Sequence, residues 1–156
     1  MNDTCTKQIL AQLGNKFNRY CIRSQLTKQE ILTQAQLTRP TLRRFEKGMG
    51  ISLLSFIRLL RIINKLDILE PLLARKPSLN SCYITKLTDS DILYSIGFDI
   101  YYNRTLSNLS QREFALKAGI SIPTLRALET GKEGVSLYTY VKCLNSIGKS
   151  KNLVKF

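Results

Sequence analysis

Hydrophobic residues recur along this chain at intervals of three and four, and no stretch alternates apolar and polar residues as a half-buried strand does. This spacing predicts an all-α protein. Serine and threonine precede several apolar stretches and glycine follows them, as is typical of helix starts and ends. We expect five short helices in each half, the fourth after Ser52 and after Ser136, and the fifth near Leu66–Leu69 and near Asn152–Phe156.

The helical pattern occurs twice. Leu13–Gly50 and Ile96–Glu133 align without a gap at an offset of 83 residues and are identical at 11 of 38 positions. Both segments contain P-T-L-R-x-x-E-x-G. A repeat at this spacing indicates duplicated small domains. We therefore expect a first domain over 1–72, a linker over 73–89 and a second domain over 90–156.

In the second copy, the first helix is expected from about Asp91 to Arg104. The next helix begins after Ser110, because S-Q-R-E is the pattern of a capping box in which Glu113 reaches back to the cap. Its counterpart in the first copy is T-K-Q-E. Gly119 is expected to end this helix, since glycine adopts a positive φ most easily.

The third helix is expected to begin after Ser121, with Pro123 in its first turn, where a missing N–H costs little. In the first copy, Thr38, Pro40 and Gly48 occupy the same places. Between the two copies, two prolines and several polar residues indicate a linker. Its S-C-Y-I-T-K-L stretch is long enough for a short strand or an extended contact.

Two helices joined by a short turn, the second one capped, form a helix-turn-helix. The second copy, with L-S-Q, A-G-I-S and T-L-R-x-L-E-x-G, resembles the lambda-repressor-like (Cro-type, XRE family) transcriptional regulators. The first copy resembles the same family, especially a subgroup with R-P-T-L-R that includes antitoxins of kinase-type toxins. The resemblance implies two tandem five-helix domains, with motifs at 28–47 and 111–130 and recognition helices at 39–47 and 122–130.

The resemblance also implies a set of DNA-binding residues. In the first copy these are Lys28, Thr38, Arg39, Pro40, Thr41, Arg43, Arg44 and Lys47, and in the second they are Gln111, Arg112, Ser121, Ile122, Pro123, Thr124, Arg126 and Lys132. In the family, the glutamine at the position of Gln111 binds phosphate and often a base. The family's structural ion pair maps to Arg104 and Glu129. Arginine can read guanine by two parallel hydrogen bonds.

The first copy departs from the family at three positions. Cys21 replaces the first-helix arginine, Leu32 replaces a small alanine, and Gln36 replaces the turn glycine. Glu46 therefore needs a partner other than an arginine.

The net charge of +13, from 24 basic and 11 acidic residues, favours a polyanionic partner. Residues 1–78 carry +9, from 14 basic and 5 acidic residues, whereas residues 79–156 carry +4, from 10 and 6. Because the recognition helices differ, we expect two different half-sites, with the arginine-rich first copy supplying more of the affinity.

Other compositional features exclude several classes of function. The chain has no histidine, which removes the commonest general base, and its four cysteines form no C-x-x-C pair. We expect free buried thiols, no metal site, no cofactor and no enzymatic activity. No apolar run is long enough for a membrane span, and the start of the chain lacks a signal-peptide pattern. The expected location is the cytoplasm.

The expected function is sequence-specific regulation of transcription through double-stranded DNA, and the alternatives concern partners. One chain can act as a pseudo-dimer, or two chains can form a homodimer. The runner-up is an antitoxin-type module that neutralises a partner and represses its own promoter. A toxin or RNA polymerase would then be the protein partner, and a phage or mobile-element origin fits either hypothesis. An RNA-binding regulator is a third, weaker alternative, since RNA readers usually show aromatic platforms.

Overall fold

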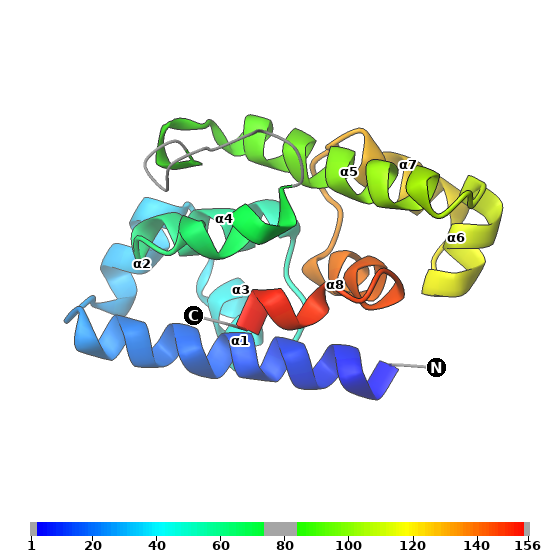
Figure 1. Ribbon diagram of the computed structural model, residues 1–156. Helices are drawn as coiled ribbons and strands as arrows, with labels where there is room; N and C mark the ends of the chain where they lie inside the picture. The colour runs from blue at the N-terminus through cyan, green and yellow to red at the C-terminus, as the bar shows by residue number, and fades with distance from the viewer. Residues whose placement is uncertain (1–2, 74–83, 155–156) are drawn as a thin grey trace.

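The computed structural model describes residues 3–73 and 84–154, and the regular elements in these ranges are helices (Figure 1). The N-terminal half, residues 3–73, contains α1 (Asp3–Arg23), α2 (Lys28–Ala35), α3 (Arg39–Glu46), α4 (Leu53–Ile62) and the 3₁₀ helix η1 (Leu66–Leu72). The C-terminal half, residues 84–154, contains η2 (Ile84–Lys86), α5 (Asp89–Leu106), α6 (Gln111–Ala118), α7 (Ile122–Glu129), α8 (Leu137–Ser146) and η3 (Ser150–Val154). The predicted all-α class is confirmed. No described helix is long and apolar enough to cross a bilayer.

Most predicted helices are present, with differences at their ends. α5 begins at Asp89 and not at Asp91, because Thr88 caps it in a capping box with Asp91. The first helices are not short, since α1 has 21 residues and α5 has 18. For the end of the linker the sequence left a short strand or an extended contact open, and Ile84–Lys86 forms a 3₁₀ turn instead. The rest of the predicted linker before it, residues 74–83, lies outside the described residues.

The two halves pack against each other reciprocally. α1 contacts α8, and α5 contacts α4, so the first helix of each half packs against the fourth helix of the other half (Figure 1). η1 contacts η3, and α4 contacts α8, so these elements meet their own counterparts. A reciprocal arrangement of this kind is the signature of an isologous interface.

The centre of this arrangement is a short backbone bridge. Ser52 and Ser136, the caps of α4 and α8, form an isolated antiparallel bridge. Leu53 N donates to the carbonyl oxygen of Val135 at 2.8 Å, and Leu137 N donates to that of Ile51 at 2.8 Å. The two hydrogen bonds use the same atoms of equivalent residues, which again makes the contact reciprocal.

Side chains extend the reciprocity across the interface. Arg61 of α4 binds the carboxylate of Asp89 at 2.9 Å, and Arg58 lies 3.3 Å from the same carboxylate. At the equivalent place on the other side, Asn145 of α8 donates to the hydroxyl of Thr6 at 3.0 Å. The buried apolar residues of both halves form one continuous cluster. Burial across the interface therefore fixes how the halves sit together.

Candidate DNA interface

The pairs α2–α3 and α6–α7 begin with the caps that the sequence predicts. Thr27 and Ser110 form complete capping boxes with Glu30 and Glu113. The hydrogen bond from the Ser110 hydroxyl holds the pKa of the Glu113 carboxyl below its usual value. These caps satisfy backbone N–H groups that a helix start leaves unpaired. The second helix of each pair begins after Thr38 or Ser121. The side chain of each cap accepts a hydrogen bond from the backbone N–H of the residue three positions later.

The turn between the two helices has the same conformation in both halves. Gly119 ends α6 at φ 64°, and Gln36 ends α2 at φ 54°. Both lie in the left-handed region, which favours glycine. The next residue then closes the turn, with Ile120 N donating to Ala115 O at 3.0 Å and Leu37 N donating to Leu32 O at 3.0 Å. Gln36 therefore preserves the turn that glycine makes in the C-terminal half.

Two glycines let the second helix of each pair approach the first helix of its half. A Cβ on Gly97 of α5 would lie 2.2 Å from the carbonyl oxygen of Leu128, and one on Gly14 of α1 would lie 2.3 Å from that of Phe45. No side chain fits at either place. Leu128 and Phe45 are themselves buried and anchor α7 and α3 in the core. The outward faces of α3 and α7 are fixed by these contacts.

A buried ion pair holds α7 against α5. Arg104 Nε donates to Glu129 Oε1 at 2.6 Å, and Nη2 donates to Oε2 at 3.3 Å. The side chains are only 8% and 6% exposed. Arg104 Nη1 also donates to the carbonyl oxygen of Leu109 at 2.8 Å, which ties the loop before α6 to the same group. This is the structural role that the resemblance implied for the pair.

The N-terminal half replaces this pair with a weaker one. Cys21 occupies the position of Arg104, and burial, followed by the nearby charge of Glu46, raises the pKa of its thiol to about 11. The partner that Glu46 needs is Lys28, whose Nζ lies 3.2 Å from its carboxylate. The Lys28 side chain is 74% exposed. Exposed pairs of this kind contribute little to stability.

The C-terminal half has a further contact that sequence reasoning missed. Gln111 Nε2 donates to Glu129 Oε2 at 2.8 Å, and Arg126 Nε donates to Gln111 Oε1 at 2.9 Å. Arg126 thus joins the buried pair through Gln111. Gln111 opens α6 and Arg126 lies in the middle of α7. Their separation of 15 residues has no motif of its own, so only the packing of the two helices reveals the contact.

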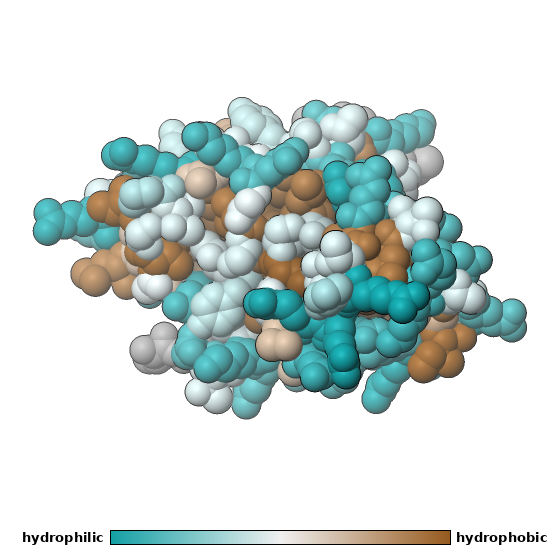
Figure 2. Space-filling model, turned by 180° about the vertical axis from the view of Figure 1, so that it is seen from behind, coloured by the Kyte–Doolittle hydropathy of each residue, from teal (hydrophilic) through white to brown (hydrophobic). Residues whose placement is uncertain are grey.

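The predicted DNA-binding residues fall on accessible positions. Thr41, Gln111, Ile122 and Thr124 are half-buried, and the remaining twelve are exposed: Lys28, Thr38, Arg39, Pro40, Arg43, Arg44, Lys47, Arg112, Ser121, Pro123, Arg126 and Lys132. α3 and α7 both lie at the back of the view in Figure 1. Figure 2 shows that side of the molecule, where hydrophilic side chains surround several hydrophobic patches. The structure thus brings α3 and α7, which carry many of these residues, to one side, and whether the residues bind DNA stays a prediction.

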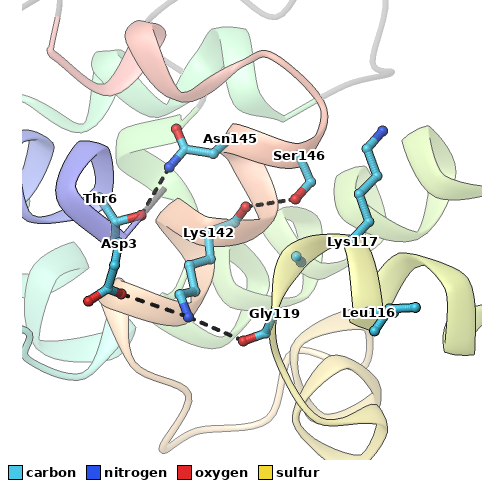
Figure 3. Close-up of a pocket in the computed structure, with 9 residues that line it drawn as sticks. Asp3, Thr6, Leu116, Lys117, Gly119, Lys142, Asn145 and Ser146 are labelled. Atoms are coloured by element: carbon cyan, nitrogen blue, oxygen red, sulfur yellow. Dashed lines mark hydrogen bonds and ion pairs between the residues drawn. The ribbon is translucent and has the colours of Figure 1, made fainter. Parts of the chain in front are cut away.

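Two grooves contact the helices of the two motifs, one beside α2 and α3 and one beside α6. The α2–α3 groove, of about 510 Å³, is lined by Lys28, Gln29, Leu32, Arg39, Leu42, Arg43 and Glu46. The α1–α8 groove, of about 500 Å³, is shown in Figure 3 and is lined mainly by α1, α8 and the end of α6. In it, Lys142 Nζ donates to the carbonyl oxygen of Gly119 at 3.2 Å and lies 4.0 Å from Asp3 Oδ1. Lys142 therefore links the turn after α6 to the N-terminal half.

The described cysteines and tyrosines differ in how deeply they are buried. Cys21 and Cys143 are buried free thiols and Cys5 is half-buried, whereas Cys82 lies outside the described residues. Burial raises the pKa of the Cys143 thiol to about 12. Within the described ranges, no three potential metal-ligating side chains come together. Tyrosines occur both in the core and on the surface, from the fully buried Tyr140 to Tyr94, which is 61% exposed.

Residues 100–153 match the family model described as helix-turn-helix. This segment contains α6 and α7 with the turn at Gly119. Searches of curated proteins and of solved structures each gave no significant match. The C-terminal half of this chain therefore contains a helix-turn-helix domain.

Proposed function

We propose that this chain is a sequence-specific regulator of transcription, without enzymatic activity, in which both halves present a helix-turn-helix to double-stranded DNA. The observation that carries the proposal is the recurrence of the C-terminal geometry in the N-terminal half. The close approach of Gly97 to Leu128 recurs as that of Gly14 to Phe45, at the same offset of 83 residues. Caps and the left-handed turn recur at the same offset.

The reciprocal packing supports a single-chain pseudo-dimer. In dimeric regulators, two-fold symmetry places two recognition helices about one helical turn, ~34 Å, apart on the DNA. Here the contacts α1–α8 and α5–α4 relate the halves as an isologous interface relates two subunits. α3 and α7 lie on the same side of the molecule (Figure 1). A single chain would then read two half-sites without a second copy.

The charge distribution supports binding of the DNA backbone. Arg39, Arg43 and Arg44 are exposed on α3, and the whole chain carries +13. Each phosphate contact by lysine or arginine releases counterions, so affinity should fall steeply as salt rises. Because α7 carries one arginine where α3 carries three, the two half-sites should differ in sequence.

Footprinting on the DNA upstream of its own gene tests the proposal. The expected result is two adjacent protected patches of about 10 base pairs each, with one chain bound per duplex in light scattering. One patch would contradict a second working motif. No protection would contradict DNA binding altogether, and a co-purifying protein in that case would favour an antitoxin-type interaction module.

A further inference from the structure

Resting on the proposed function, we propose that Gln111 is a positioning residue that holds Arg126 for a guanine in the half-site read by α7. On this proposal, α3 lacks such a residue and its arginines contact mainly phosphates. The C-terminal half would then supply most of the base discrimination, and the N-terminal half would supply mainly phosphate contacts. The proposal differs from the role that the resemblance implies for Gln111, which is direct contact with DNA.

The first step is that both ends of the Gln111 amide are already engaged. A carboxylate only accepts hydrogen bonds and a guanidinium only donates them. The amide NH₂ must therefore face Glu129, at 2.8 Å, and the amide oxygen must face Arg126, at 2.9 Å. No other orientation of this amide satisfies both partners. Glu129 is fixed in turn by Arg104 at 2.6 Å, so the chain of contacts begins in the core.

The second step concerns the donors that Arg126 retains. A guanidinium has five N–H groups, and the contact with Gln111 uses only the one on Nε. The described structure gives Nη1 and Nη2 of Arg126 no partner, and the residue is exposed on α7. These two nitrogens form a fork that can donate to O6 and N7 of guanine in the major groove. Fixing the side chain beforehand reduces the entropy lost on binding.

The third step is the contrast with α3. Lys28 stands where Gln111 stands in the other half, and its ammonium pairs with Glu46 at 3.2 Å. Lysine has no acceptor, so it cannot hold Arg43, the counterpart of Arg126. In the part of the chain that the structure describes, the side chain of Arg43 has no hydrogen bond or ion pair, and it lines the open α2–α3 groove. An arginine that no neighbouring side chain holds suits phosphates better than one base edge.

The test replaces Gln111 by lysine, the residue that Lys28 supplies at the equivalent position of the N-terminal half. Gln111→Lys retains a partner for Glu129 but removes the acceptor for Arg126. The preferred duplex is first selected by the full chain from random double-stranded DNA. Each guanine of the half-site assigned to α7 is then replaced in turn by the other three bases, with the matching partner, and by 7-deazaguanine. The affinity for each duplex is measured by fluorescence anisotropy. 7-Deazaguanine lacks the N7 acceptor and removes one of the two hydrogen bonds.

The wild-type chain should prefer guanine over the other bases by about fivefold to 150-fold, and 7-deazaguanine should weaken binding. Gln111→Lys should reduce the preference about twofold to tenfold, the cost of ordering one side chain. Arg126→Ala should abolish it. Gln12→Lys, which adds the same charge on an exposed position of α1, should leave it unchanged.

Three outcomes would overturn the inference, and they can be told apart. If Gln111→Lys weakens all duplexes equally while its helical circular dichroism is retained, Gln111 has only a structural role. If the preference for guanine persists in Gln111→Lys, Arg126 needs no positioning. If the wild-type chain selects no duplex at all, the proposed function itself fails.

Discussion

Tyr140 is the clearest case of a side chain that costs stability. It is fully buried in α8, and its hydroxyl has no hydrogen-bond partner among the described residues. Burial, with the nearby charges of Asp99 and Cys143, raises the pKa of this hydroxyl well above its usual value. The equivalent residue in α4 is Phe56, which is also buried and needs no partner. The fold thus accepts a phenyl ring at this position.

We predict that Tyr140→Phe stabilises the protein by about 1–2 kcal/mol, because an unsatisfied buried hydroxyl is removed without leaving a cavity. Urea denaturation should show a higher midpoint at an unchanged slope. The matched variant Phe56→Tyr should lower the midpoint, since it buries a hydroxyl in the other half. An unchanged or lower midpoint for Tyr140→Phe would mean that the hydroxyl has a partner, such as a bound water.

The ion pairs Arg104–Glu129 and Lys28–Glu46 lie at equivalent positions but differ in burial. Removing the basic residue should therefore destabilise the protein by different amounts. Arg104→Ala leaves Glu129 buried at 6% exposure without its main partner. We expect a loss of about 3–5 kcal/mol, as for other buried pairs broken on one side. Lys28→Ala removes a side chain that is 74% exposed, so the expected loss is below about 1 kcal/mol. Thermal denaturation of both variants tests this, and equal losses would contradict the structural role of Arg104.

At the scale of elements, the turn between the two motif helices tests how much each half depends on glycine. Gln36 holds φ 54° where Gly119 holds φ 64°. A residue with a Cβ in this region is strained by about 1–2 kcal/mol, partly offset because glycine is more flexible in the unfolded chain. We predict that Gln36→Gly stabilises the N-terminal half by about 0.5–1 kcal/mol. The measurement is the midpoint of chemical denaturation.

The exchange in the other half serves as the control. Gly119→Gln should destabilise by a similar amount, since a Cβ there meets only Lys142 Nζ at 3.7 Å and the cost is conformational. If Gln36→Gly destabilises instead, the side chain of Gln36 makes a contribution that its exposed position does not suggest.

Local patterns predict most of these elements, because caps and turn residues act on their nearest neighbours. The boxes at Thr27 and Ser110, the cap at Ser121 and the turn at Gly119 were all predictable. The capping box at Thr88 was missed because its third residue is aspartate and not glutamate or glutamine. The sequence gives no local signal for contacts between helices.

The candidate site shows the same limit. The exposed positions on α3 and α7 follow from a helical period and two buried anchors. The contact of Gln111 with Arg126 and that of Lys28 with Glu46 depend instead on how two helices cross. The resemblance therefore predicted which residues could meet DNA, and the packing decides which of them are held in place.

For the whole molecule, the reciprocal packing determines how α3 and α7 are spaced. Ser52 and Ser136 bridge the halves, Asp89 binds Arg61 at 2.9 Å, and one apolar core extends through both. Separating the halves would expose that core to water, which is costly. The spacing between α3 and α7 is therefore a property of the packed fold. This makes the spacing of the two half-sites in DNA testable.

We predict that the protein tolerates no change in that spacing. Five base pairs inserted between the half-sites rotate one of them by about half a turn, so the fixed helices can no longer engage both. Affinity should fall by about 100-fold or more, the loss expected when a second linked contact is removed. Ten inserted base pairs restore the phase but not the distance, so affinity should stay low. Five base pairs inserted outside the half-sites serve as the control. Equal affinity for the ten-base-pair insertion and the original duplex would show that the halves separate on DNA, contrary to the packing at Ser52 and Ser136.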